Sequence, residues 1–152
     1  MAYESVHVVC FGNELHADDG FGPAVHSLLQ GLTLPKHVHL FRADISGLSA
    51  INCFDNCHHA IVVDALRGYG PAGSLHHLEA SQAAVEAAPG SHGAGVGSLL
   101  KLLPLTLAQP PSISLLGAEV AHIESFSPGL SEAVADAVPR AGALLMEQLN
   151  HV

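Results

Sequence analysis

The stretch VHVVCFGNELHADDGFG, from Val6 to Gly22, decides the fold. Its first part, Val6–Phe11, is an almost continuous apolar run, as is typical of a strand buried on both faces. A run with helical periodicity, from about Phe21 to Gln30, follows directly. Two adjacent acids, Asp18 and Asp19, lie between glycines at the junction. The stretch therefore predicts a strand, a tight turn and a helix, with one of the two acids capping the helix.

The same alternation of apolar runs and helical stretches continues along the chain. Further strands are expected at His37–Arg42, His59–Val63, Ser74–Glu79 and Ser112–Val120, and further helices at Leu48–Phe54, Val96–Leu107 and from about Ser127 to Leu149. Pro104 and Pro139 are expected to end, kink or split the last two helices. This pattern predicts one domain over residues 1–152 with a three-layer α/β/α fold, phosphorylase/hydrolase-like, around a mainly parallel twisted sheet of about five strands.

Composition narrows the classes of partner. The chain has 152 residues, 49% of them apolar, and a formal net charge of -9 with only five Lys and Arg. A protein with this negative net charge is poorly suited to bind nucleic acid or an anionic membrane. It is better suited to bind a basic segment of a partner or a metal cation. No apolar run is long enough to span a bilayer, and no basic segment precedes an apolar one as in a signal peptide. Three cysteines argue against a disulfide framework and favour a reducing cytoplasm.

Acidic side chains follow the first three predicted strands. Asp18 and Asp19 come after the first, Asp44 after the second, and Asp64 closes the third. Because the carboxyl ends of neighbouring parallel strands meet at one edge of a sheet, these acids should converge there. Close carboxylates repel unless a cation or a shared proton offsets their charge, so a metal or acid–base site is one interpretation, with His92 as a nitrogen ligand. The other interpretation is structural: Asp44 as a turn acid, His92 as an ordinary histidine.

Other motifs give weaker signals. Dinucleotide-binding, P-loop, zinc-protease and serine-hydrolase signatures are absent from the sequence. Cys53 and Cys57, followed by His58 and His59, could suggest a second metal site, but two buried thiols at a helix and strand start are the favoured explanation. The adjacent His76 and His77 fall in a predicted strand, so their rings should point to opposite faces.

Taken in order, several motifs resemble those of the nickel-iron hydrogenase maturation endopeptidases. The opening motif of that family is similar to Gly12-Asn13 with Asp18-Asp19-Gly20-Phe21-Gly22. Its later motifs are similar to Val62-Val63-Asp64-Ala65 with Gly70-Pro71-Ala72-Gly73, to Ser91-His92 before Gly95 and Leu99-Leu100, to Ser114-Leu115-Leu116-Gly117, and to Gly129-Leu130-Ser131. Each motif is modest alone, but the ordered set covers nearly the whole chain.

The resemblance implies an endopeptidase that removes a C-terminal peptide from the hydrogenase large-subunit precursor after nickel insertion. By position in the motifs, the metal ligands would be Asp19, Asp64 and His92. The nickel would be supplied by the precursor, although another divalent metal could substitute in vitro. Asp44 would orient or deprotonate the attacking water or contact the substrate, while Asp18 would support the turn. The enzyme is expected to be a cytoplasmic monomer.

Two alternatives stay open at this point. The first is a non-proteolytic nickel-handling or hydrogenase-binding maturation module that uses the same ligands. The second is a metal-independent protease in which two carboxylates share a proton. The Asp-Thr-Gly or Asp-Ser-Gly signature of aspartic proteases is absent from the sequence, which lowers the second alternative.

Overall fold

A computed structural model describes residues 4–43, 49–82, 94–121 and 127–151. They contain a five-stranded sheet in the order β2-β1-β3-β5-β4. The strands are β1 (Val6–Phe11), β2 (Val38–Ala43), β3 (His59–Leu66), β4 (Leu75–Glu79) and β5 (Ser112–Glu119). Strands β2, β1, β3 and β5 run parallel to one another, and β4 pairs antiparallel with β5 at one edge. The predicted mainly parallel sheet is confirmed.

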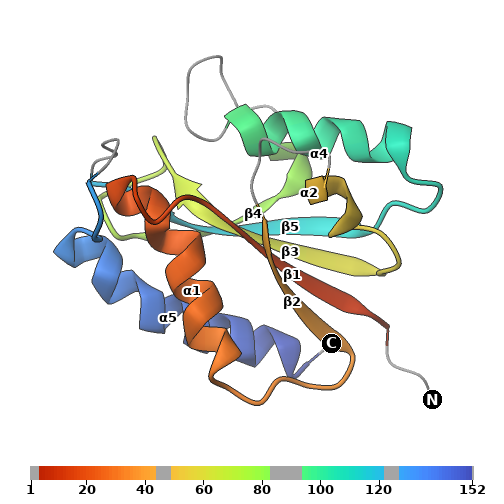
Figure 1. The fold of residues 1–152 in the computed structure, drawn as a ribbon, viewed down its shortest axis with the longest axis horizontal. Helices are drawn as coiled ribbons and strands as arrows, with labels where there is room; N and C mark the ends of the chain where they lie inside the picture. Colours follow the sequence, from red (N-terminus) through yellow and green to blue (C-terminus); the bar gives the residue numbers. More distant parts are fainter. Residues whose placement is uncertain (1–3, 44–48, 83–93, 122–126, 152) are drawn as a thin grey trace.

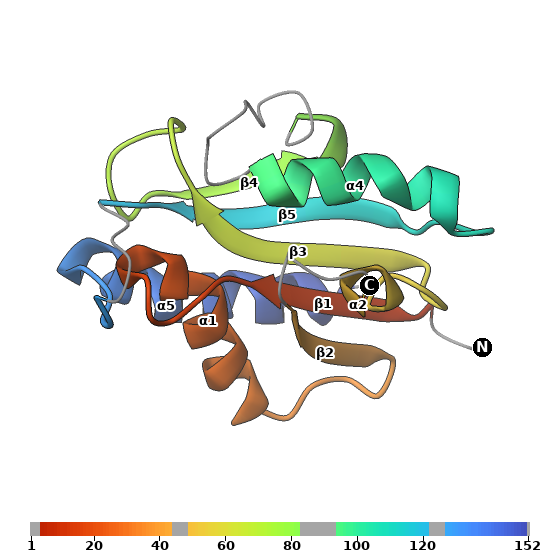
Figure 2. The same ribbon diagram turned by 45° about the horizontal axis from the view of Figure 1, so that its top comes forward.

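Helices cover both faces of the sheet, which gives the three predicted layers (Figures 1 and 2). On one face, α1 (Phe21–Gln30) packs with α5 (Glu132–Leu149), and on the other lie α2 (Ser49–Asn52) and α4 (Ala94–Thr106). A short 3-10 helix, η1 (Ala17–Gly20), links β1 to α1. Within the described ranges, no helix combines the length and the apolar character that crossing a bilayer requires.

The burial of each strand follows from its place in the sheet. All six residues of β1 are buried, because this strand has neighbours on both sides and helices on both faces. The edge strand β2 is only partly buried, with Val38 its one buried residue. Alternate β1 side chains enter two separate apolar clusters: Val8 packs toward α1 and α5, and Phe11 packs toward α2 and α4. The near-continuous apolar run that opens the chain is thus explained by two-sided burial.

Three local details differ from what the sequence predicts: β3 does not end at Val63, and neither Pro139 nor Pro104 ends or splits its helix. Strand β3 continues through Asp64 to Leu66, because its pairing with β5 extends beyond its pairing with β1. Helix α5 is one helix through Pro139, which lies on its exposed side, where water can satisfy the backbone carbonyl that loses its partner. Helix α4 likewise continues past Pro104 to Thr106.

The strand order places a topological switch point between β1 and β3. From β1 the chain goes to β2 on one side, and β3 then returns to pair with β1 on the other side. In open parallel sheets, ligands bind outside the carboxyl ends of the strands at such a point. We call the edge where β1, β3 and β5 end the carboxyl edge, and the edge where they begin the amino edge.

Candidate functional site

The turn after β1 depends on two glycines. Gly12 has a φ of +138°, and a Cβ there would lie 2.1 Å from the carbonyl oxygen of Asp19. A Cβ on Gly22 would lie 1.9 Å from the carbonyl oxygen of Phe11. Both contacts are shorter than any real Cβ contact, so only glycine lets η1 and the start of α1 fold back onto the end of β1.

Asp19 lies in η1 directly above this turn. Its carboxylate accepts a hydrogen bond from the Asn13 backbone N–H at 3.0 Å, and only 6% of the residue is exposed. Its own N–H donates to the His16 carbonyl within the 3-10 turn. Helix η1 contacts β3 as well as α1. Asp19 is therefore held at the switch point between β1 and β3.

Asp64 reaches the same edge from β3. Its pairing partner on β5 is Gly117, whereas the β1 ladder stops one residue earlier, at Val63. Alternation along the strand puts Asp64 on the same face as Val62 and Leu66, which pack toward α4. The residue is 1% exposed, and its carboxylate accepts the Ala65 N–H at 2.8 Å. An acid buried this deeply in an apolar strand needs compensating partners.

Asp18 differs from its neighbour in what it binds. It is fully buried, and its carboxylate accepts the N–H groups of Ala121 at 2.8 Å and Ser131 at 2.7 Å and the Ser131 hydroxyl at 2.9 Å. The expected capping of α1 by an acid is wrong, because Gly20 occupies that N-cap position without a side-chain bond. Asp18 instead joins η1 to the start of α5, where Ser131 is the N-cap.

The other two predicted site residues, Asp44 and His92, lie outside the described residues. Their sequence neighbours do not: β2 ends at Ala43 opposite Phe11, and α4 covers the face that carries Asp64. Among the residues that the structure describes, no three His, Cys, Asp or Glu side chains gather closely enough to hold a metal ion. The structure thus brings Asp19 and Asp64 to one edge, while Asp44 and His92 stay predictions.

The two placed residues suit a divalent cation by their chemistry. Both are carboxylates, which bind hard and borderline divalent ions, and both are almost fully buried at the switch point. An imidazole from the chain before α4 would complete a set of two oxygens and one nitrogen with open positions. The donors present fit such a metal.

A fourth buried acid, which the sequence analysis does not predict, lies at this edge. Glu119, the last residue of β5, is 6% exposed. Its carboxylate accepts the N–H of Gly68 at 2.9 Å and that of Tyr69 at 2.7 Å. The signal was available, because Glu119 ends an apolar strand just as Asp64 interrupts one. The same question of compensation applies to both acids.

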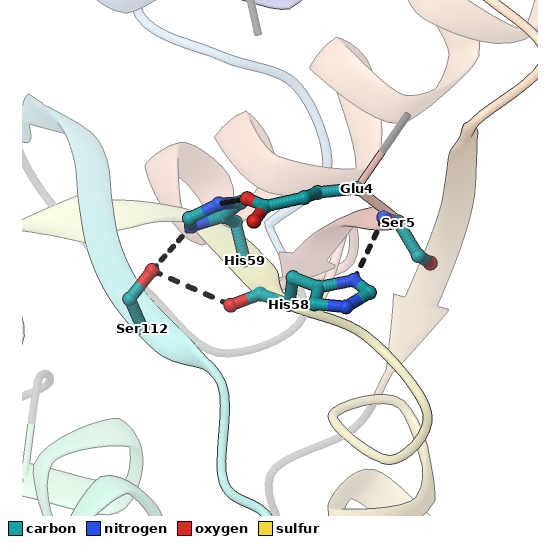
Figure 3. A network of polar contacts seen from close by, with 5 residues as sticks. All are labelled: Glu4, Ser5, His58, His59 and Ser112. Carbon is teal, nitrogen blue, oxygen red and sulfur yellow. Dashed lines mark hydrogen bonds and ion pairs between the residues drawn. The ribbon is translucent and has the colours of Figure 1, made fainter. Parts of the chain in front are cut away.

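The amino edge carries a different polar cluster (Figure 3). His59 contacts the Ser112 hydroxyl through Nδ1 and the Glu4 carboxylate through Nε2, both at 2.5 Å. His58 accepts the Ser5 N–H through Nδ1 at 3.0 Å. His59 and Ser112 also line a hollow of about 560 Å³ beside the end of α5. These contacts hold the start of the chain against β3 and β5, at the edge opposite Asp19 and Asp64.

His76 and His77 make hydrogen-bond contacts of their own, and the cysteines are buried or half-buried. His76 contacts the Ser74 hydroxyl and His77 the Gln148 amide, which confirms that the two rings point to opposite faces. All three cysteines are free. Cys57 is buried and Cys53 half-buried, and burial raises the pKa of both, that of Cys57 to about 11.

The geometry of Cys10 reports on the carboxyl edge. Burial, and then the nearby charge of Asp64, raise the pKa of its thiol to about 12. A thiol with that pKa is almost wholly protonated at neutral pH and is a poor nucleophile. Cys10 belongs to the apolar cluster that β1 forms with α1 and α5.

Known proteins share both the sequence pattern and the fold. The family model for hydrogenase maturation proteases of the HycI type matches residues 23–148. A hydrogenase 2 maturation peptidase from a Thaumarchaeota archaeon is 30% identical, with a TM-score of 0.70 over 96% of this chain and 98% of that chain. The hydrogenase-maturating endopeptidase HybD of Escherichia coli, 22% identical, has the same fold, with a TM-score of 0.83 over 97% of this chain and 93% of that chain. Because the family model covers most of its length, the chain belongs to the hydrogenase maturation protease family.

Proposed function

We propose that the protein removes a C-terminal peptide from a hydrogenase large-subunit precursor after nickel has been inserted. The inserted nickel, as part of the substrate, would be recognised by Asp19, Asp64 and His92. The observation that carries this proposal is the pair of buried carboxylates, Asp19 and Asp64, at the switch point of the sheet. Membership of the family supports the peptidase activity itself.

In this mechanism the chain's own residues position the substrate and manage protons. Asp19 and Asp64 would hold the metal-bearing segment of the precursor, and bound nickel would supply Lewis acidity and a report that insertion is complete. Asp44 would orient the attacking water and accept its proton. Water then adds its oxygen to the peptide carbonyl, the C–N bond breaks, and the proton passes to the leaving amine.

The direct test uses the natural substrate. We would incubate the protein with nickel-loaded and with nickel-free precursor and follow loss of the C-terminal extension by intact mass. Cleavage of the loaded form alone is the expected result. Cleavage of both forms, unaffected by a chelator, would overturn nickel recognition, and retained binding without cleavage would favour a non-proteolytic maturation module.

Variants assign the roles within the site. Asp19→Asn, Asp64→Asn and His92→Ala should each lose cleavage of the loaded precursor while keeping the wild-type circular dichroism spectrum. Removing a residue that only supports a metal ligand typically lowers metal affinity or activity by about 10–100-fold, and removing a ligand itself should cost at least as much. Asp136→Asn is the matched control, because this acid is exposed on α5. Full activity in Asp64→Asn would contradict the ligand assignment.

A further inference from the structure

Residues 119–121, where the chain leaves β5, touch both of the segments that carry the proposed ligands. On one side, the Glu119 carboxylate accepts the N–H groups of Gly68 and Tyr69 in the loop after β3. On the other side, the Ala121 N–H donates to the Asp18 carboxylate in η1 at 2.8 Å. We call residues 119–121 the post-β5 segment. It is a short physical link between the strand of Asp64 and the turn of Asp19.

At the η1 end of this link, further hydrogen bonds hold Asp18. Asp18 also accepts the N–H and the hydroxyl of Ser131, and that hydroxyl accepts the Val134 N–H of α5. Three hydrogen bonds therefore fix a carboxylate that is fully buried. Because Asp19 is the next residue of the same 3-10 turn, fixing Asp18 restricts where the backbone of Asp19 can lie.

At the other end of the link, Glu119 makes several hydrogen bonds to the loop after β3. Besides the two bonds to its carboxylate, Glu119 accepts the Gly73 N–H through its carbonyl at 2.8 Å and donates its own N–H to the Ser74 carbonyl at 2.9 Å. Both ends of the loop after β3 are thus bonded to one residue. Glu119 also lies opposite Leu66 in the β3–β5 ladder, two residues beyond Asp64.

Charge strengthens these links. Hydrogen bonds to a carboxylate are stronger than those between two neutral groups. Burying a carboxylate costs free energy unless its oxygens accept hydrogen bonds. The backbone N–H groups that donate to each acid must therefore stay within hydrogen-bonding distance of it. Glu119 within the post-β5 segment, and Asp18 bound to Ala121 of that segment, together define its position relative to the loop after β3 and to η1.

We propose that Asp18 and Glu119 are positioning residues that act through the post-β5 segment to set the separation of Asp19 and Asp64. The inference rests on the proposed function for its consequence in catalysis, because those two carboxylates are the proposed ligands. It has a consequence independent of catalysis: loosening Glu119 on one side must loosen Asn13, whose N–H binds Asp19, on the other side.

Amide hydrogen exchange measures this coupling in the free protein. Glu119→Gln keeps one acceptor but sets an amide N–H₂ against a backbone donor, so exchange at Gly68 and Tyr69 should accelerate. The informative site is Asn13, where we expect acceleration of about tenfold, equal to about 1.4 kcal/mol of lost protection. Asp18→Asn should accelerate exchange at Asn13 and also at Tyr69.

Two controls separate coupling from general loosening. Ser74→Ala removes a hydroxyl that donates to the Pro71 carbonyl and contacts His76, but it removes no hydrogen bond of the Glu119 carboxylate. Glu132→Gln removes the exposed acid in the first turn of α5. Both should leave exchange at Asn13 unchanged within about twofold. If Glu119→Gln does not fold, Glu119→Asp keeps the charge and withdraws it by one methylene, and the same coupling is expected.

The catalytic consequence is read from nickel-loaded precursor. Glu119→Gln should raise KM about 10–100-fold, as when the outer partners of metal ligands are removed, with a smaller change in kcat. Accelerated exchange confined to Gly68 and Tyr69, with Asn13 unchanged, would overturn the proposal. If wild-type protein does not cleave the precursor, the proposed function fails, and exchange at Asn13 still decides whether the two residues are coupled.

Discussion

Both edges of the sheet carry carboxylates, but they hold them in opposite ways. At the carboxyl edge, Asp18 and Glu119 are buried and accept their bonds mainly from backbone N–H groups. At the amino edge, Glu4 is exposed and bonds a side chain, His59, that is itself about two-fifths exposed. Backbone donors cannot rotate away, whereas exposed side chains can. The two edges therefore differ in what holds their carboxylates: mainly backbone donors for Asp18 and Glu119, and a partly exposed side chain for Glu4.

The largest expected effect comes from the turn that brings Asp19 to the carboxyl edge. Gly12→Ala should destabilise the protein by about 4 kcal/mol, because it adds a steric clash with the Asp19 carbonyl to an unfavourable φ. Urea unfolding measures the change. Gly68→Ala is the control, since Gly68 also has a positive φ, +94°, but open space around a Cβ. Its cost should be about 1–2 kcal/mol, and equal costs for the two variants would contradict the clash.

The next largest effect tests whether the burial of an acid at the carboxyl edge contributes to the free energy of unfolding. Asp18→Ala should cost about 3 kcal/mol, because it removes a fully buried carboxylate that accepts the N–H groups of Ala121 and Ser131. Glu14→Ala is the matched control at the same edge, because Glu14 forms an exposed ion pair with Arg42 at 3.4 Å. That variant should change the free energy of unfolding by about 0.5 kcal/mol or less. Similar costs for both would remove burial as the explanation.

Thiol labelling compares the two edges without any mutation. Cys10 lies at the carboxyl end of β1 with a pKa raised to about 12, so its thiolate should be scarce until strongly alkaline pH. Cys53 is half-buried and should react first with a maleimide at pH 8, followed by Cys57, whose pKa is raised to about 11. Peptide mass mapping gives the order, and early modification of Cys10 would show that the carboxyl edge opens readily.

The smallest effect is expected at the amino edge. The hydrogen bond and then the charge of His59 lower the pKa of Glu4 from its ordinary value of 4.5. A lowered pKa in the folded state adds stability above pH 4.5, and this stability is lost as the pH falls through the lowered value. Glu4→Gln should therefore match wild type in acid and differ from it only slightly at neutral pH. Thermal melts from pH 3 to 7 would reveal a large gap if this edge were as stiff as the other.

The fold was largely predictable because its signals are local. The buried run Val6–Phe11 and the helical run after it appear where expected. Asp19 and Asp64 were predicted to meet at one edge, and the sheet order puts their segments there. The predicted ends were less accurate: β3 runs past Asp64, because its length depends on a partner, β5, about fifty residues away in the chain.

Long-range partners were not predictable. The sequence allowed Asp18 to be a helix cap, and only the folded chain shows that its donors come from Ala121 and Ser131, more than a hundred residues later. Glu119 was not predicted as a buried acid either, because the residues it binds, Gly68 and Tyr69, lie about fifty residues away in the chain. Asp44 and His92 lie outside the described residues and await the variant experiments.

The sequence by itself determined which residues could enter a core and where strands, turns and helices would begin, because apolar periodicity and glycine placement act between near neighbours. It also indicated the family, through the order of its motifs. Only the tertiary structure decided what holds Asp18, the acid that the family motifs assign to the support of the turn. Its backbone donors come from Ala121 and Ser131, which reach it only when β5 and α5 have packed against the turn after β1.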